Sequence, residues 1–177
     1  MKKIACITGA SSGIGRATAQ SLAKEGFHLI LCGRRKERLE DLQASLSVQS
    51  TILTFDVGDQ PSVIKAFDSL PDEWKNIDVL VNNAGNAHGM SAIQDGVVSD
   101  WEAMMSSNVT GLLYVSKEVM KGMVDRKSGH IINLSSIAGK QTYPNGNVYC
   151  ASKAAVEALS AGTVSYTHLT LPTILRV

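Results

Sequence analysis

The stretch Thr8-Gly9-Ala10-Ser11-Ser12-Gly13-Ile14-Gly15 lies between a short apolar segment and a longer segment with helical spacing. Glycines in such a turn let the chain reverse sharply and bring backbone N–H groups against a pyrophosphate at the N-terminus of the next helix. The alternative is a loop that uses glycine only to reach a positive φ angle. Because the turn directly follows the first predicted strand, its position favours dinucleotide binding.

Apolar runs of strand length alternate with segments of helical period along the rest of the chain. We predict strands over residues 4–8, 27–32, 51–55, 77–81 and 130–134. We predict helices over residues 13–25, 37–46, 61–70 and 148–159, and a long helix that begins at a capping box formed by Ser99 and Glu102. Nearly continuous apolar strands indicate a parallel sheet buried on both faces. The predicted fold is therefore a single-domain α/β fold, a doubly wound parallel sheet of the Rossmann type.

Composition excludes several classes of protein. The formal net charge is only +1, which implies no general attraction to nucleic acid or to an anionic membrane. The three cysteines, Cys6, Cys32 and Cys150, are widely spaced and form no CxxC pair, so we expect neither a disulfide framework nor a metal site. The first apolar run ends at Thr8 and is too short for a signal peptide, and no run has the length of a transmembrane helix. We expect a cytoplasmic protein.

Further motifs follow the glycine turn in a fixed order. Asn82-Asn83-Ala84-Gly85 follows the fourth predicted strand, Asn108 lies in the long helix, Ser136 follows the fifth strand, and Tyr149-Cys150-Ala151-Ser152-Lys153 opens the last helix. With the TGxxxGxG spacing of the turn, this set resembles the short-chain dehydrogenase/reductase family. Ser136 precedes Tyr149 by 13 residues, the usual interval in that family. The resemblance implies an oxidoreductase that transfers a hydride between a nicotinamide cofactor and an alcohol or carbonyl group.

Tyr149 and Lys153 are the predicted acid/base pair. They are four residues apart on a predicted helix, so their side chains share one face, and a nearby ammonium favours the phenolate form of a tyrosine. Taken alone, the spacing would favour an exposed structural i,i+4 contact, and it is Ser136 and Asn108 in register that favour the catalytic reading. The resemblance implies that Tyr149 exchanges a proton with the substrate oxygen and that Lys153 also holds the nicotinamide ribose. It further implies that Ser136 hydrogen-bonds the substrate and that Asn108 positions a water that links Lys153 to solvent.

The end of the second predicted strand indicates which nicotinamide cofactor is used. It carries Arg34 and Arg35 and lacks the acidic residue that hydrogen-bonds the ribose in NAD enzymes. Two arginines offer charge-assisted donors to the 2′-phosphate of NADP, although they could also be a solvated start to the next helix. We therefore expect NADP rather than NAD. With the adenine contacts that the resemblance implies, the predicted cofactor-binding residues are Gly9, Ser11, Ser12, Gly13, Ile14, Gly15, Arg34, Arg35, Asp56, Val57, Asn83, Ala84, Gly85, Tyr149 and Lys153.

Residues 70–74, 122–126 and 146–149 resemble the NADP-dependent 3-hydroxy acid (serine) dehydrogenases of the family. This implies a small 3-hydroxy acid as substrate, with candidate pocket residues in 86–90 and 138–145. The family pairs its long helix and its YxxxK helix between subunits, which implies a homo-oligomer, either a tetramer or a dimer. The alternatives are a nucleotide-sensing module without catalysis and an inactive fragment of the enzyme.

The resemblance ends after Leu159. Family members continue with a sixth strand, a loop over the nicotinamide, a further helix and a seventh strand, and residues 162–177 match none of these. We interpret residues 1–161 as a truncated NADP-binding domain that lacks the last two strands, and residues 162–177 as a non-family, artefactual tail; a genuine divergent ending is the alternative. Because the edge of the fifth strand would be exposed, we expect this 177-residue polypeptide to be poorly soluble and scarcely active.

Overall fold

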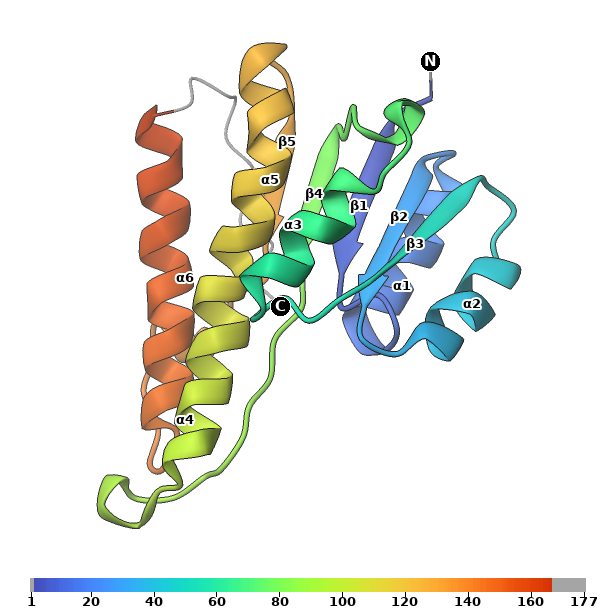
Figure 1. Ribbon diagram of the computed structural model, residues 1–177. Coiled ribbons are helices and arrows are strands. Elements are labelled where there is room, and N and C mark those ends of the chain that lie inside the picture. Colours follow the sequence, from blue (N-terminus) through green and yellow to red (C-terminus); the bar gives the residue numbers. More distant parts are fainter. Residues whose placement is uncertain (1, 167–177) are drawn as a thin grey trace.

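A five-stranded parallel sheet forms the centre of the computed structural model, which describes residues 2–166 (Figure 1). The strands are β1 (Ile4–Thr8), β2 (His28–Gly33), β3 (Ser50–Thr54), β4 (Val79–Asn82) and β5 (His130–Asn133). Their order is β3-β2-β1-β4-β5, and every neighbouring pair is parallel. This is the predicted α/β fold of the Rossmann type, and all five residues of β1 are buried, as a central parallel strand requires.

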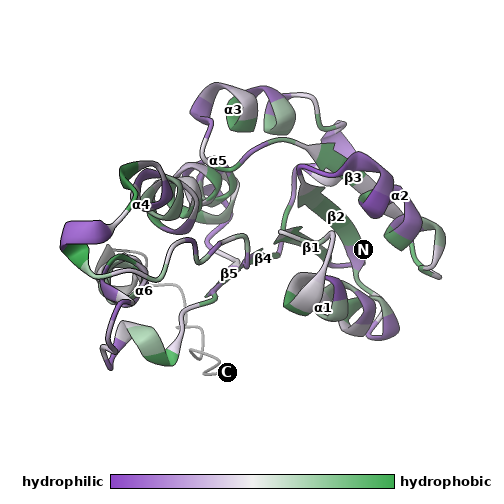
Figure 2. Cartoon of the chain, turned by 90° about the horizontal axis from the view of Figure 1, so that it is seen from below, coloured by the Kyte–Doolittle hydropathy of each residue, from purple (hydrophilic) through white to green (hydrophobic). Residues whose placement is uncertain are grey.

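Helices cover both faces of the sheet (Figure 2). They are α1 (Gly13–Lys24), α2 (Lys36–Ala44), α3 (Gln60–Asp68), α4 (Val98–Met105), α5 (Gly111–Asp125) and α6 (Asn147–Tyr166). One apolar core lies between the sheet and α3 and α5 and includes Val63, Phe67 and Val115. The other lies between the sheet and α1 and α2 and includes Ala19 and Leu39. The two cores hold the strands fixed between the helical layers.

The sheet reverses its direction of winding beside β1. The chain moves from β1 outward to β2 and β3, then crosses to β4 on the other side of β1. In open parallel sheets, such a switch point leaves a crevice at the carboxyl ends of the strands, where ligands bind. The turn after β1 and the segment after β4 therefore meet at one edge.

The long helix differs from the prediction at two points. It begins at Val98, with Val97 as N-cap and no capping side chain, so the predicted capping box of Ser99 and Glu102 is wrong. A π-helical turn, Ser106–Thr110, then separates α4 from α5. In place of a side-chain cap, the start of α4 has the ring of Trp101 packed directly against Gly96.

Helix α6 runs from Asn147 to Tyr166 and so passes through the predicted domain boundary after residue 161. The rest of the predicted tail, residues 167–177, lies outside the described residues. None of the helices in residues 2–166 has both the length and the apolar character needed to cross a membrane. Nor does this part of the chain bring together three or more His, Cys, Asp or Glu side chains that could hold a metal ion.

Candidate active site

The turn between β1 and α1 is built on glycines. Gly9 and Gly13 have φ angles of +66° and +53°, the left-handed region that glycine enters without strain. Gly15 is required for a different reason, since a Cβ atom there would lie 2.4 Å from the carbonyl oxygen of Gly9 and 2.4 Å from Nδ2 of Asn83. The first turn of α1 thus packs directly onto the preceding loop, and its N-terminus faces the sheet edge.

The hydroxyl of Thr8 joins the ends of β1 and β4. It accepts hydrogen bonds from the backbone N–H groups of Asn83 and Ala84, both at 3.0 Å. In return, Nδ2 of Asn83 donates to the carbonyl oxygen of Thr8 at 2.9 Å. Thr8 is buried, so its hydroxyl has no water as an alternative partner. The contact fixes the Asn83-Ala84-Gly85 segment beside the glycine turn.

Replacing Thr8 with Val is expected to lower the free energy of unfolding by about 1–3 kcal/mol, because the N–H of Ala84 loses its acceptor and that of Asn83 keeps only the carbonyl oxygen of Val81. Urea denaturation followed by circular dichroism measures the loss. Thr54→Val is the matched control, since Thr54 ends β3 with an exposed side chain. Equal losses for the two variants would contradict the role of the Thr8 hydroxyl.

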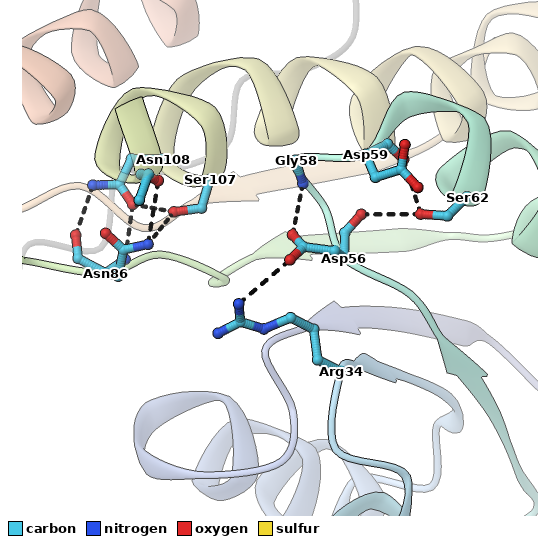
Figure 3. A network of polar contacts seen from close by, with 9 residues as sticks. Arg34, Asp56, Gly58, Asp59, Ser62, Asn86, Ser107 and Asn108 are labelled. Atoms are coloured by element: carbon cyan, nitrogen blue, oxygen red, sulfur yellow. Dashed lines mark hydrogen bonds and ion pairs between the residues drawn. The ribbon is translucent and has the colours of Figure 1, made fainter. Parts of the chain in front are cut away.

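Two arginines follow β2 at the same edge and are held differently. Nη2 of Arg35 donates to the hydroxyls of Ser11 and Ser12, each at 2.9 Å, so it is tied to the glycine turn. Arg34 is exposed and pairs at 3.3 Å with a carboxylate oxygen of Asp56, whose other oxygen accepts from the N–H of Gly58 (Figure 3). Two guanidinium groups therefore lie beside the turn that an anion would enter.

Tyr149 and Lys153 lie on one face of α6, as predicted from their spacing. Nζ of Lys153 is 5.9 Å from the centre of the Tyr149 ring and donates to the carbonyl oxygen of Leu134 at 2.9 Å. The Lys153 side chain is buried, which lowers the pKa of its ammonium below the ordinary value. The Tyr149 hydroxyl has no hydrogen-bond partner among residues 2–166, so it is free to meet a substrate.

These groups line a single cleft of about 430 Å³. Its walls contain every predicted cofactor-binding residue except Gly13 and Gly15. Gly15 does not line the cleft, but its lack of a side chain allows the close packing of the turn. The walls of the cleft include Arg34 and Arg35 as well as Tyr149 and Lys153. The cleft thus brings two guanidinium groups together with the predicted acid/base pair.

The short chain dehydrogenase family profile matches residues 3–167, which is most of the chain. The chain belongs to the short-chain dehydrogenase family. Its cleft is formed at the switch point of the sheet, by three of the motifs on which the sequence resemblance rested: the glycine turn, the Asn83-Ala84-Gly85 segment and the pair Tyr149 and Lys153.

Two curated relatives of this short-chain dehydrogenase are similar over most of its length. The NADP-dependent 3-hydroxy acid dehydrogenase of Escherichia coli (strain K12) is 43% identical over 157 residues, 89% of this chain and 63% of that protein. The serine 3-dehydrogenase of Rhizobium radiobacter is 44% identical over 162 residues, 92% of this chain and 65% of that protein. The chain therefore spans less than two thirds of the length of these relatives.

A solved structure described as the closed form of serine dehydrogenase complexed with NADP+ has the same fold. It aligns with a TM-score of 0.91 at 40% identity, covering 95% of this chain and 69% of that one. A serine dehydrogenase structure from Escherichia coli aligns with a TM-score of 0.90 at 41% identity, covering 94% of this chain and 78% of that one.

Asn108 of this short-chain dehydrogenase lies in the π turn, and its side chain is fully engaged (Figure 3). Its Oδ1 accepts from the N–H of Asn86 at 2.8 Å and from the Ser107 hydroxyl at 3.1 Å. Its Nδ2 donates to the carbonyl oxygen of Asn86 at 2.9 Å and to the Ser152 hydroxyl at 3.0 Å. A carboxamide has no further hydrogen-bonding capacity. A water held by Asn108 would therefore have to bind its backbone.

Ser136 caps the short helix Ile137–Gly139, where its Oγ accepts from the N–H of Ala138 at 3.2 Å. Neither Ser136 nor Asn108 is among the residues that line the cleft, whereas their neighbours Ser135 and Ser107 are. Sequence reasoning did not assign Thr8, although its hydroxyl and its place before Gly9 were visible signals. Cleft residues outside the predicted catalytic and cofactor set are Gly33, Phe55, Asn86, Ala87, Ser107, Leu134 and Ser135.

Proposed function

We propose that the whole protein carrying this chain is an NADP-dependent short-chain dehydrogenase, which transfers a hydride between NADP(H) and the alcohol or carbonyl group of a small 3-hydroxy acid. The observation that carries the proposal is the single cleft that joins Tyr149 and Lys153 to two arginines. The named activities of the relatives, 3-hydroxy acid dehydrogenase and serine 3-dehydrogenase, support the substrate class. We also propose a cytoplasmic homo-oligomer, either a tetramer or a dimer.

The residues present fit NADP at both ends of the cleft. The glycine turn packs closely on Asn83 through Gly9 and Gly15 and leads into the N-terminus of α1, the kind of site at which a pyrophosphate binds. At the end of β2, Arg34 and Arg35 are suited to a 2′-phosphate, and the strand is not followed by the acidic residue that hydrogen-bonds the ribose in NAD enzymes. When bound, the nicotinamide supplies the site that accepts or gives the hydride.

The chain's own residues handle the proton. In the direction of alcohol oxidation, the Tyr149 oxygen takes the proton of the substrate hydroxyl, and in reduction it returns that proton to the carbonyl oxygen. The Lys153 ammonium stabilises the phenolate, and its bond to the Leu134 carbonyl fixes its position, while its other two N–H groups have no partner among residues 2–166. Ser136 is proposed to hydrogen-bond the substrate oxygen, and Asn108 to hold the π turn beside Lys153.

A direct assay tests the function. The whole protein is incubated with NADP+ and serine or 3-hydroxybutyrate, and the absorbance of reduced nicotinamide is followed. We expect reduction of NADP+ with both 3-hydroxy acids and much slower reduction with NAD+. If tight NADP+ binding is accompanied by no reduction with any hydroxy acid or other alcohol, the protein is a nucleotide-binding module and the proposal is wrong.

The choice of cofactor gives a separate prediction. Replacing Arg34 with Ser is expected to weaken NADP+ binding about 10- to 100-fold, because a charge-assisted bond to the phosphate is lost, and to leave NAD+ binding nearly unchanged. Isothermal titration calorimetry with each nucleotide measures both constants. Arg38→Ser, at an exposed position of α2, is the control. Equal losses for NADP+ and NAD+ would show that Arg34 does not recognise the 2′-phosphate.

A further inference from the structure

A tight turn precedes helix α6, between Ser136 and Tyr149. It consists of Tyr143-Pro144-Asn145-Gly146, and the N–H of Gly146 donates to the carbonyl oxygen of Tyr143 at 3.2 Å. Asn145 has a φ angle of +65°, which with proline before it is typical of a type II turn. The carbonyl oxygen of Gly146 then accepts the first bond of α6, from the N–H of Cys150 at 2.8 Å. The turn and the start of the helix are therefore one rigid unit.

The ring of Tyr143 packs against Gly146. A Cβ atom on Gly146 would be 2.1 Å from Cε2 and 2.5 Å from Cζ of that ring, so only glycine allows this packing. Gly146 is three residues before Tyr149, and residues three apart at the start of a helix are neighbours on one face. The Tyr143 ring thus lies at the start of the helix that carries Tyr149, and it is not among the residues that line the nucleotide cleft.

The phenol of Tyr143 is an unused hydrogen-bond donor. Its hydroxyl has no hydrogen-bond partner among residues 2–166, and the side chain is partly exposed. Loss of hydration, followed by the charges of Cys150 and Tyr149, raises its pKa above the ordinary value, so the hydroxyl keeps its proton at neutral pH. Lys140, in the same segment, pairs at 3.6 Å with Glu157 on α6.

We infer that Tyr143 is a substrate-binding residue, whose hydroxyl donates a hydrogen bond to the carboxylate of the 3-hydroxy acid while Tyr149 meets the reacting oxygen. The inference rests on the proposed function, because it assigns a binding partner to the carboxylate, the second polar group of a 3-hydroxy acid. The packing of the Tyr143 ring against Gly146 already restricts this side chain. Little side-chain entropy is therefore lost when its hydroxyl binds the carboxylate.

The test compares an acid with its ester in the whole protein. Tyr143→Phe keeps the ring on Gly146 and removes only the hydroxyl. For 3-hydroxybutyrate we expect KM to rise about 10- to 100-fold, the effect of one hydrogen bond to a charged group, with kcat changed less than about threefold. For the methyl ester of the same acid, and for NADP+, KM should change less than about threefold. Tyr114→Phe on α5, in the apolar core, is the control.

A binding measurement makes the test independent of turnover. Butyrate carries the carboxylate but has no hydroxyl to oxidise, and calorimetric titration into the NADP+ complex gives its affinity. We expect Tyr143→Phe to lower the affinity for butyrate by the same factor by which it raises KM for 3-hydroxybutyrate. Gly146→Ala, which displaces the ring, should lower the affinity for butyrate to the same extent. Equal effects on acid and ester, or unchanged butyrate binding, would overturn the inference. Loss of all hydroxy acid turnover in the unaltered protein, with butyrate binding still sensitive to Tyr143→Phe, would instead count against the proposed function alone.

Discussion

Replacing Tyr149 with Phe is expected to lower kcat for hydride transfer by about 10²- to 10⁴-fold in the whole protein, the range for removal of a general acid/base. The variant keeps the ring beside Lys153 and loses only the hydroxyl, which has no hydrogen-bond partner within residues 2–166. Neither the fold nor the contacts of the glycine turn depend on that hydroxyl. We therefore expect the affinity for NADP+ to change less than about threefold.

Stopped-flow measurement of nicotinamide absorbance gives the rate, and calorimetry gives the affinity. Tyr114→Phe serves as control, because it removes the same atom from a tyrosine that packs against the core. A Tyr149→Phe variant with undiminished turnover would exclude this residue as the acid/base. A variant that loses NADP+ binding and turnover together would place Tyr149 in binding rather than in proton transfer.

Strands were the easiest elements to predict, because burial on both faces leaves a short continuous apolar run. The strand predicted at residues 4–8 coincides with β1, and that at 27–32 is displaced by one residue from β2. Periodicity cannot place such ends, since β2 extends to Gly33 only because it pairs with Thr54 of β3. Strand order could be predicted only through the family resemblance.

Interactions between distant segments could not be predicted from local spacing. The π turn around Asn108 is held by Asn86 and Ser152, 22 and 44 residues away in the chain. The hydroxyl of Thr8 meets N–H groups 75 and 76 residues away. Glycine spacing predicted the turn, because φ angles are a local property. It could not predict that Gly15 would pack against Asn83.

The contact of Gly15 with Gly9 and Asn83 leads to the second large effect. A Gly15→Ala variant places a methyl group 2.4 Å from the Gly9 carbonyl oxygen and 2.4 Å from Nδ2 of Asn83. The carbonyl belongs to the backbone, and Nδ2 is held by Thr8 at 2.9 Å, so neither can yield without breaking the turn. We expect NADP+ affinity to fall at least about 100-fold, and the free energy of unfolding to fall by about 2–4 kcal/mol.

Calorimetry with NADP+ and urea denaturation measure the two effects of Gly15→Ala. Gly162→Ala is the matched control, because a Cβ at that position of α6 meets no atom within 4 Å and alanine favours a helix. It should therefore leave NADP+ binding unchanged and raise stability by up to about 1 kcal/mol. If Gly15→Ala behaved like this control, helix α1 would not lie against the carbonyl of Gly9. The pyrophosphate would then need a different binding site, because the close packing of α1 directs the N-terminal N–H groups of this helix toward the cleft.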